Sequence, residues 1–493
     1  MRKLLLIPAI FSLALSVACG GSGSSNNGDG GFGSGGSNGY SAASLSGQYA
    51  YQVSGFDFNT GANLPFKESG VFTADGKGNI TSGTDDFAEG TSTFSDPTTG
   101  TYTVSSDGTG SINLGFSSGS SITLALTIAS SSKVLLTVPV INGVAESTGS
   151  GIALKQDTTT LSTVPSGYFA FASHTVSTTL GSAATAGAFS ITTGTIAGDE
   201  DVLQAGALAP HTLTGLFNTP DVSGRGTVTF TNELSSTATM NYYIVDANTM
   251  LLFSTVAGVN GIGRAEKQSA NTFAVSSLSG NYAFGSKGDT GSLDAVNSAG
   301  RFTAGGDGTI TAGVFDSVQD GTPVSNIGFT GTYTMAANGR AVLNLTPATG
   351  SAIEQVAYVV SPTRAFFLVN DAAKVEDGTM DGQSASFSNS SLNGNYAFAT
   401  DGFNTTDSFN RLGTLNGDGA GNLKLDYVLT EPTLTSQTVS LTGTYTVASN
   451  GRAVGNVANL SSNFVMYLIS GTDGYIVQAD SGTQMAGSFS KQQ

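Results

Sequence analysis

The sequence predicts an all-β protein made of four tandem units, each with eight antiparallel strands. Three observations predict this class: one block recurs four times, short segments within a block alternate apolar and polar residues with a period of two, and Gly, Asn, Asp or Pro turns separate these segments. No window shows an apolar helical stripe with caps.

The recurring block is marked by a glycine followed two residues later by an aromatic residue. This marker aromatic stands at positions 49, 169, 282 and 396, with spacings of 120, 113 and 114 residues. About fifty residues later each copy carries a second Gly-x-aromatic marker, and then a Gly turn of the Asp-Gly or Asn-Gly kind that favours hairpins. The units predicted from these markers span 44–157, 161–268, 277–387 and 391–493.

The third unit shows the strand pattern in order. We expect strands at 281–286, 299–304, 309–318, 327–335, 340–346, 353–360, 364–370 and 379–387. Apolar residues alternate with Ser and Thr, which indicates one buried and one solvated face. Consecutive hairpins favour a small up-and-down barrel, which has no exposed edges, over an immunoglobulin-like sandwich. Half-repeats of four strands, assembled as a propeller, are a further alternative.

Composition excludes several classes of function. The 493 residues include 18 Lys and Arg against 35 Asp and Glu, a net charge of -17, so nucleic-acid binding is not expected. One Cys cannot form a disulfide within the chain, and two His with one Cys are too few for a usual zinc site. We predict no cofactor and no bound metal. The 28 Phe and 15 Tyr suffice for four cores.

The N-terminus has the pattern of a signal peptide over residues 1–18. Arg2 and Lys3 precede an apolar stretch, which leads through Ser16-Val17-Ala18 to Cys19, the one cysteine of the chain. This pattern resembles the lipobox of bacterial lipoproteins, although that family prefers Leu where Ser16 stands. The resemblance implies that Cys19 is lipidated and becomes the mature N-terminus. An ordinary secretory signal, cut near Ala18, is the alternative.

Residues 19–43 form the predicted lipidated Cys and tether. Nineteen of the 24 residues from 20 to 43 are Gly, Ser or Asn, a composition that cannot bury enough apolar surface to fold. Gly20 and Gly21 carry no acidic inner-membrane retention signal. By analogy with lipoproteins we expect a bacterial cell-envelope location, anchored to the outer membrane and facing either the periplasm or the outside.

The repeats carry a second resemblance. The patterns Ser-Leu-Ser-Gly-x-Tyr-Ala-Phe, Gly-x-Phe-Thr-Ala-x-Gly-x-Gly and Thr-Gly-Thr-Tyr-Thr resemble uncharacterised Gly/Ser/Thr-rich repeat lipoproteins of bacterial envelopes. That family implies no chemistry. The opening Leu-Ser-Gly-x-Tyr also resembles the first strand of lipocalin-like and avidin-like barrels, whose pocket Trp residues are missing here.

Several short segments could carry chemistry. The turns at Asp75, Asp307 and Asp418 resemble fragments of calcium loops, but each offers one carboxylate where Ca²⁺ needs six to eight oxygens. We predict plain hairpin turns, with a surface cation site that includes Asp86 or Asp316 as the alternative.

Catalytic motifs are sparse. Gly115-Phe116-Ser117-Ser118-Gly119 matches the nucleophile pattern Gly-x-Ser-x-Gly, but it lacks the strand–turn–helix context and nearby His. His174 and His211 could pair within the second unit; we expect them to be solvated or loosely packed. The acid clusters Asp85-Asp86 and Asp199-Glu200-Asp201 are predicted to be solubilising charges, since neighbours on a strand point to opposite faces and so do not form a glycosidase pair.

The sequence therefore predicts a non-enzymatic, envelope-anchored lipoprotein that acts as a structural, adhesive or binding scaffold. Its protein, glycan or small-ligand partner is unknown. The alternative is a carrier that holds a small hydrophobic ligand or a glycan in each barrel lumen. Large inward side chains would fill the lumen, and small ones would leave it open.

Overall fold

The computed structural model describes residues 39–58, 64–138, 147–232, 237–290, 295–319, 321–404, 407–432, 434–457, 460, 464–480 and 482–493. Within these ranges the chain forms strands and three 3-10 helices of three residues each. None of the described helices is long and apolar enough to cross a membrane. The all-β prediction is confirmed.

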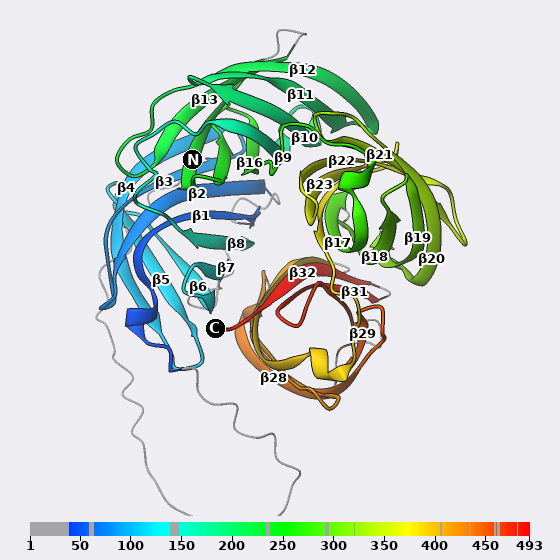
Figure 1. Cartoon of the computed structure of the whole chain (residues 1–493). Helices are drawn as coiled ribbons and strands as arrows, with labels where there is room; N and C mark the ends of the chain where they lie inside the picture. Colours follow the sequence, from blue (N-terminus) through cyan, green and yellow to red (C-terminus); the bar gives the residue numbers. More distant parts are fainter. Residues whose placement is uncertain are drawn as a thin grey trace, which may run out of the picture.

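The strands form four closed barrels, each of eight antiparallel strands that pair in sequence order (Figure 1). This confirms the barrel over the sandwich and the propeller. Barrel 1 contains β1 (Ser46–Asp57), β2 (Leu64–Asp75), β3 (Asn79–Glu89), β4 (Ser92–Val104), β5 (Thr109–Phe116), β6 (Ser121–Ser130), β7 (Lys133–Thr137) and β8 (Ser147–Lys155). Barrel 2 contains β9 (Gly167–Ser177), β10 (Gly181–Thr192), β11 (Thr195–Gln204), β12 (Ala207–Phe217), β13 (Arg225–Asn232), β14 (Thr237–Asp246), β15 (Thr249–Ser254) and β16 (Val259–Lys267).

Barrels 3 and 4 repeat the arrangement. Barrel 3 contains β17 (Ser279–Asp289), β18 (Ala295–Gly305), β19 (Thr309–Gln319), β20 (Thr322–Met335), β21 (Arg340–Pro347), β22 (Ile353–Ser361), β23 (Arg364–Asn370) and β24 (Val375–Gly382). Barrel 4 contains β25 (Asn393–Asn404), β26 (Ser408–Asp418), β27 (Asn422–Glu431), β28 (Leu434–Val447), β29 (Arg452–Val457), β30 (Phe464–Leu468), β31 (Asp473–Asp480) and β32 (Thr483–Lys491). The last strand of barrel 3 was expected at 379–387 but ends at Gly382, and Phe387 packs in the core of barrel 4.

Aromatic and aliphatic side chains fill most of each described lumen, to which Glu68 and Asp85 are added in barrel 1 and Arg411 in barrel 4. In barrel 3 the inward residues Tyr282, Phe284 and Phe302 are at most 6% exposed, and the Tyr282 and Phe302 rings stack with centroids 5.4 Å apart. The other three lumens have equivalent clusters. Large inward residues thus meet the criterion for a filled barrel, so a ligand held in a barrel lumen does not fit this structure.

A tyrosine from the second marker holds the 3-10 turn that closes three of the barrels. Tyr333 on β20 donates to the carbonyl oxygens of Val275 (3.0 Å) and Leu278 (2.6 Å), at the turn η2 (Val275–Ser277). The same two bonds are made by Tyr102 at η1 (Ala42–Ser44) and by Tyr445 at η3 (Asn389–Ser391). Barrel 2 has Phe217 at this position, and no such turn precedes β9.

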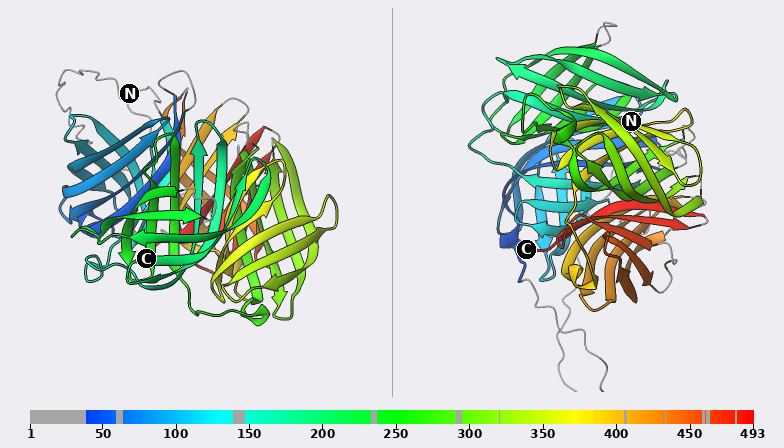
Figure 2. Two further views of the ribbon diagram at one scale, coloured as in Figure 1. Left: turned by 90° about the horizontal axis from the view of Figure 1, so that it is seen from above. Right: turned by 45° about the vertical axis from the view of Figure 1, so that its right-hand side comes forward.

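The four barrels lie around a common centre, as Figures 1 and 2 show. The first strands of each barrel pack against the last three strands of the next: β1–β3 on β14–β16, β9 and β10 on β22–β24, and β17–β19 on β30–β32. β25 and β26 of barrel 4 pack in the same way on β6–β8 of barrel 1. Each interface joins two different faces, and the rotation closes after four units, so the chain forms a ring.

A glutamine at the end of each unit fixes the next barrel in place. Gln156 Nε2 donates to the carbonyl oxygens of Ser223 (3.0 Å) and Ile244 (2.6 Å) in barrel 2. Gln268 and Gln383 make the equivalent pairs of bonds to barrels 3 and 4. Gln492, at the end of the fourth unit, donates to the carbonyl oxygens of Asp107 (2.9 Å) and Ile128 (3.0 Å) in barrel 1, which closes the ring.

The outer faces of these strands are buried between barrels. The alanine between the two marker aromatics faces away from the lumen, yet it is fully buried in all four copies: Ala50, Ala170, Ala283 and Ala397. The expectation of one solvated face is therefore wrong for the strands at the interfaces. A small side chain at this position allows two sheets to approach closely.

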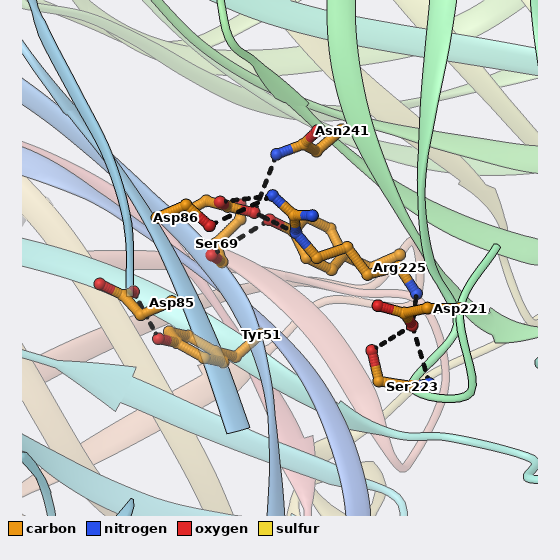
Figure 3. A network of polar contacts seen from close by, with 10 residues as sticks. Tyr51, Ser69, Asp85, Asp86, Asp221, Ser223, Arg225 and Asn241 are labelled. Carbon is orange, nitrogen blue, oxygen red and sulfur yellow. Dashed lines mark hydrogen bonds and ion pairs between the residues drawn. The ribbon is translucent and has the colours of Figure 1, made fainter. Parts of the chain in front are cut away.

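Three of the four interfaces contain the same buried ion pair. Between barrels 1 and 2, Arg225 donates from Nε and Nη2 to the two carboxylate oxygens of Asp86 at 2.7 and 2.8 Å (Figure 3). Tyr243 and Asn241 also donate to Asp86, which is 1% exposed. The next two interfaces repeat the arrangement with Asp201, Arg340 and Tyr358, and with Asp316, Arg452 and Tyr467.

The fourth interface lacks this ion pair because both sides of it differ. Val428 pairs with Leu412 where Asp316 pairs with Ala299, so Val428 stands at the aspartate position. In barrel 1, Thr109 follows the turn glycine where the other barrels have Arg, and its strand partner Thr127 stands where they have Tyr. Leu412 packs there with Ala129, Leu135 and Ala397. The acid and its partners are thus missing together, and neither is left buried alone.

Candidate functional site

One position of the first strand brings polar side chains to the centre of the ring. Seven residues after the marker glycine, the four barrels carry Ser54, His174, Lys287 and Asp401. All four line a cavity of about 260 Å³ between the barrels, and the last three also line an adjoining cavity of about 470 Å³. Because every barrel contributes to both cavities, this site belongs to the closed ring and to no single unit.

Charged contacts cross the middle of this axial site. His174 Nδ1 lies 2.8 Å from Asp377 Oδ1, and its Nε2 lies 3.9 Å from Asp289. Lys287 forms an ion pair with Asp401, which also accepts a bond of 2.7 Å from Ser150 Oγ. These contacts connect barrel 2 with barrel 3, barrel 3 with barrel 4, and barrel 4 with barrel 1.

Lys67 on β2 lines the smaller cavity and is only 9% exposed. Among the described residues its ammonium group has no ion pair within 4 Å. Burial lowers the pKa of Lys67 to about 8, although the carboxylates of Asp377, Asp401 and Asp289 oppose this shift. The smaller cavity therefore contains a buried cation that no single carboxylate neutralises.

The larger cavity is lined by Lys287, Asp377 and Asp401 and by three further cationic side chains. Lys133, Arg264 and Arg364 line it, while the acids that pair with the arginines, Glu266 and Asp381, are not among its lining residues. Arg364 donates to both oxygens of Glu266 (2.8 and 3.0 Å) and to Asp381 (2.8 Å). Arg264 Nε lies 2.6 Å from Glu266.

Lys133 is the cation of this group without a carboxylate at contact distance in the described chain. Its Nζ donates to the neutral Ser490 Oγ at 2.8 Å. Burial lowers the pKa of Lys133; the carboxylates of Asp473 and Asp381 oppose this shift, whereas the charges of Arg264 and Arg364 add to it. Lys287, Asp377 and Asp401 also line this cavity, so its charges are close to balanced and Lys133 differs from the other cations by its pairing alone.

The concentration of basic residues here is high for such an acidic chain. Of the 18 Lys and Arg, 16 follow the predicted signal peptide. Five of these 16 line the two cavities: Lys67, Lys133, Arg264, Lys287 and Arg364.

The turn aspartates hold their own hairpins. Asp75 accepts from the backbone N–H groups of Lys77 (2.7 Å) and Asn79 (3.0 Å), and Asp307 and Asp418 make similar bonds. Side-chain bonds from Asn79 and Thr309 help to lower the pKa values of Asp75 and Asp307. The described residues contain no group of three or more His, Cys, Asp or Glu that could hold a metal ion.

The alternative cation site at Asp86 or Asp316 is wrong, because both lie at barrel interfaces, bound by arginine and tyrosine. The acid clusters are likewise not solubilising charges. Asp85 is 3% exposed and accepts from Tyr51 inside barrel 1, while Asp86 points the opposite way (Figure 3). Asp201 is fully buried. The opposite orientation of neighbouring acids was predicted correctly; their burial was not.

The other candidates do not come together. Ser117 lies at a hairpin turn and donates to Asp96 at 3.1 Å, and the two His belong to another barrel. His174 on β9 and His211 on β12 lie on strands that are not neighbours, and His174, partly exposed, pairs with Asp377 of barrel 3. Cys19 and the signal peptide lie outside the described residues, as does the tether up to residue 38.

Sequence reasoning missed the axial site and the residues that build the ring. A signal for the ring was present: the marker alanine, the terminal glutamine and the arginine after the turn glycine recur between copies. No comparable signal marked the axial site, since its four positions carry four different residues.

Comparisons with known proteins identify no family. No family model and no curated protein matches the chain. Among solved structures, kievitone hydratase from Nectria haematococca is 10% identical and covers 49% of this chain and 92% of its own, with a TM-score of 0.19. Transferrin Binding Protein B from Haemophilus parasuis Hp5 is 10% identical, with a TM-score of 0.17; the match covers 73% of this chain and 83% of that protein. At these TM-scores neither likeness carries a functional argument.

Proposed function

We propose that this protein is a non-enzymatic lipoprotein of the bacterial cell envelope, in which four barrels form one rigid scaffold. The observation that carries the scaffold function is the closure of the ring: four packed barrels are joined by four interfaces, three of them with a buried Asp–Arg–Tyr group. Such an assembly suits a structural or binding function, because its repeated residues build the interfaces between barrels. Among the described residues, the candidate motifs at Ser117, His174 and His211 do not come together as catalytic groups.

The anchor rests on the sequence. Cys19 follows a signal-like segment and precedes a Gly/Ser/Asn-rich tether. Two or three acyl chains hold a protein firmly at a membrane, whereas one chain binds only marginally. A tether of 24 residues would span roughly 25–30 Å, enough to separate the ring from the membrane surface.

Intact mass spectrometry of the protein recovered from bacterial membranes tests the anchor. We expect a mature chain that begins at Cys19 and carries the added mass of acyl chains. The Cys19→Ser variant should leave the membrane fraction while its ring still folds. A wild-type chain that is cut near Ala18, unmodified and soluble would contradict the lipoprotein proposal.

A further inference from the structure

We propose that the axial site binds one small organic anion per chain, with a single negative charge carried on an apolar body. The acidic group would lie in the larger cavity at Lys133, beside Arg264 and Arg364. This inference goes beyond the scaffold function and does not depend on the lipid anchor.

The pairing of the cationic side chains favours an anion at Lys133. Glu266 and Asp381 already receive the two arginines, whereas Lys133 has only the hydroxyl of Ser490. A charge that is taken out of water is stabilised by a partner of opposite sign. One ammonium without a carboxylate at contact distance matches a monoanion such as a carboxylate better than a doubly charged phosphate.

The size and walls favour an apolar body. A volume of about 470 Å³ lies within the range of small-molecule sites, roughly 300–1,000 Å³. Leu135, Ile152, Ile262 and Phe366 supply apolar wall, and each comes from a strand that lines this cavity. An aliphatic carboxylate of moderate length could place its head at Lys133 and its chain against these residues.

Isothermal titration with octanoate tests the proposal, using the Cys19→Ser chain, which retains every described residue. We expect one octanoate per chain, because the ring has one axis, and weaker binding as salt increases. 1-Octanol, which has the same chain length without the charge, should bind at least about tenfold more weakly.

Variants at Lys133 identify the contact. Lys133→Met should weaken octanoate about tenfold to a hundredfold, the effect of losing one charge-assisted bond, and Lys133→Arg should keep most of the affinity. Lys77→Met removes an exposed lysine and serves as the matched control. Melting curves check that each variant folds, and the comparison of octanoate with octanol needs no variant.

Four results would each overturn the proposal: no binding of octanoate, equal binding of octanol, four sites per chain, or a folded Lys133→Met variant with unchanged affinity. None of these results bears on Cys19. The failure of this test is therefore distinguishable from the failure of the envelope proposal.

Discussion

Lys67 is the residue at which burial and charge conflict most clearly. An unfolded chain holds this ammonium in water, with a pKa near 10.5, whereas the folded ring lowers its pKa to about 8 through burial. The unfolded state therefore binds the proton more tightly. Below pH 8 Lys67 is charged in both states, and burial of this charge destabilises the folded state by about 3 kcal/mol. As pH rises from 8 to 10.5, this cost disappears.

Lys67→Met should consequently stabilise the protein at pH 7. Methionine keeps most of the length of the side chain and removes the buried charge, so we expect a gain of about 2–3 kcal/mol in the free energy of unfolding. The gain should shrink toward zero by about pH 10.5. Urea unfolding at pH 7 and at pH 10.5 measures it, with Lys77→Met as an exposed control. A less stable variant at pH 7 would show that the charge of Lys67 is compensated.

Tyr333 allows the packing of a lumen residue to be separated from its hydrogen bonds. Tyr333→Ala removes a buried ring and should cost about 3–5 kcal/mol. Tyr333→Phe keeps the ring and loses only the bonds to Val275 and Leu278, so we expect a cost of about 1–3 kcal/mol. Phe217 stands at the same position in barrel 2 and has no hydroxyl. Phe217→Leu therefore changes the packing alone and serves as a control. Urea unfolding of the whole chain would contradict the core assignment if Tyr333→Ala left the transition unchanged.

At the scale of elements, each buried aspartate at an interface faces an arginine and a tyrosine, and the interface without the aspartate also lacks these partners. Asp316 shows why the three residues occur together. Burial alone would raise its pKa, but the bonds from Arg452, Tyr467 and Ser325, together with the charge of Arg452, outweigh burial and lower it. An acid in this position is stabilised only while its partners are present.

Asp316→Val should therefore cost about 3–5 kcal/mol, because Arg452 and Tyr467 lose their shared acceptor at the interface. The triple variant Asp316→Val, Arg452→Thr, Tyr467→Thr copies the residues of the fourth interface and should recover part of this loss. Thermal unfolding of the single variant, the triple variant and the wild type measures the difference. A triple variant whose loss equals or exceeds that of the single variant would contradict this account.

The elements were predictable, but their assembly was not. Alternation around Tyr282, Phe284 and Tyr333 identified the strands, because a barrel wall imposes a period of two on its inward face. The same rule misassigned the other face, since Ala283 and Asp316 are covered by the neighbouring barrel and not by water. The axial site was beyond this reasoning: it joins Lys133, Arg264 and Arg364 from three units, and no period within a unit relates them.

At the scale of the whole molecule, the contact between barrels 4 and 1 differs from the other three. Linkers join barrel 1 to 2, 2 to 3 and 3 to 4, so opening any of those interfaces leaves the neighbours tethered. Barrel 4 is held to barrel 1 by packing and by bonds such as those of Gln492 alone. Figure 1 shows the C-terminus at this junction. The ring should therefore open here first.

Leu412→Asp provides the test, because Leu412 is 2% exposed, faces away from the lumen and packs against Ala129 and Leu135 of barrel 1. A buried carboxylate without a partner would cost several kcal/mol, so the interface should part while barrel 4 stays closed.

Small-angle X-ray scattering should show a larger radius of gyration with unchanged circular dichroism, and octanoate should no longer bind. Thr442→Asp, on the exposed face of β28, should change none of these. A compact, monomeric Leu412→Asp chain would show that the ring does not depend on this contact.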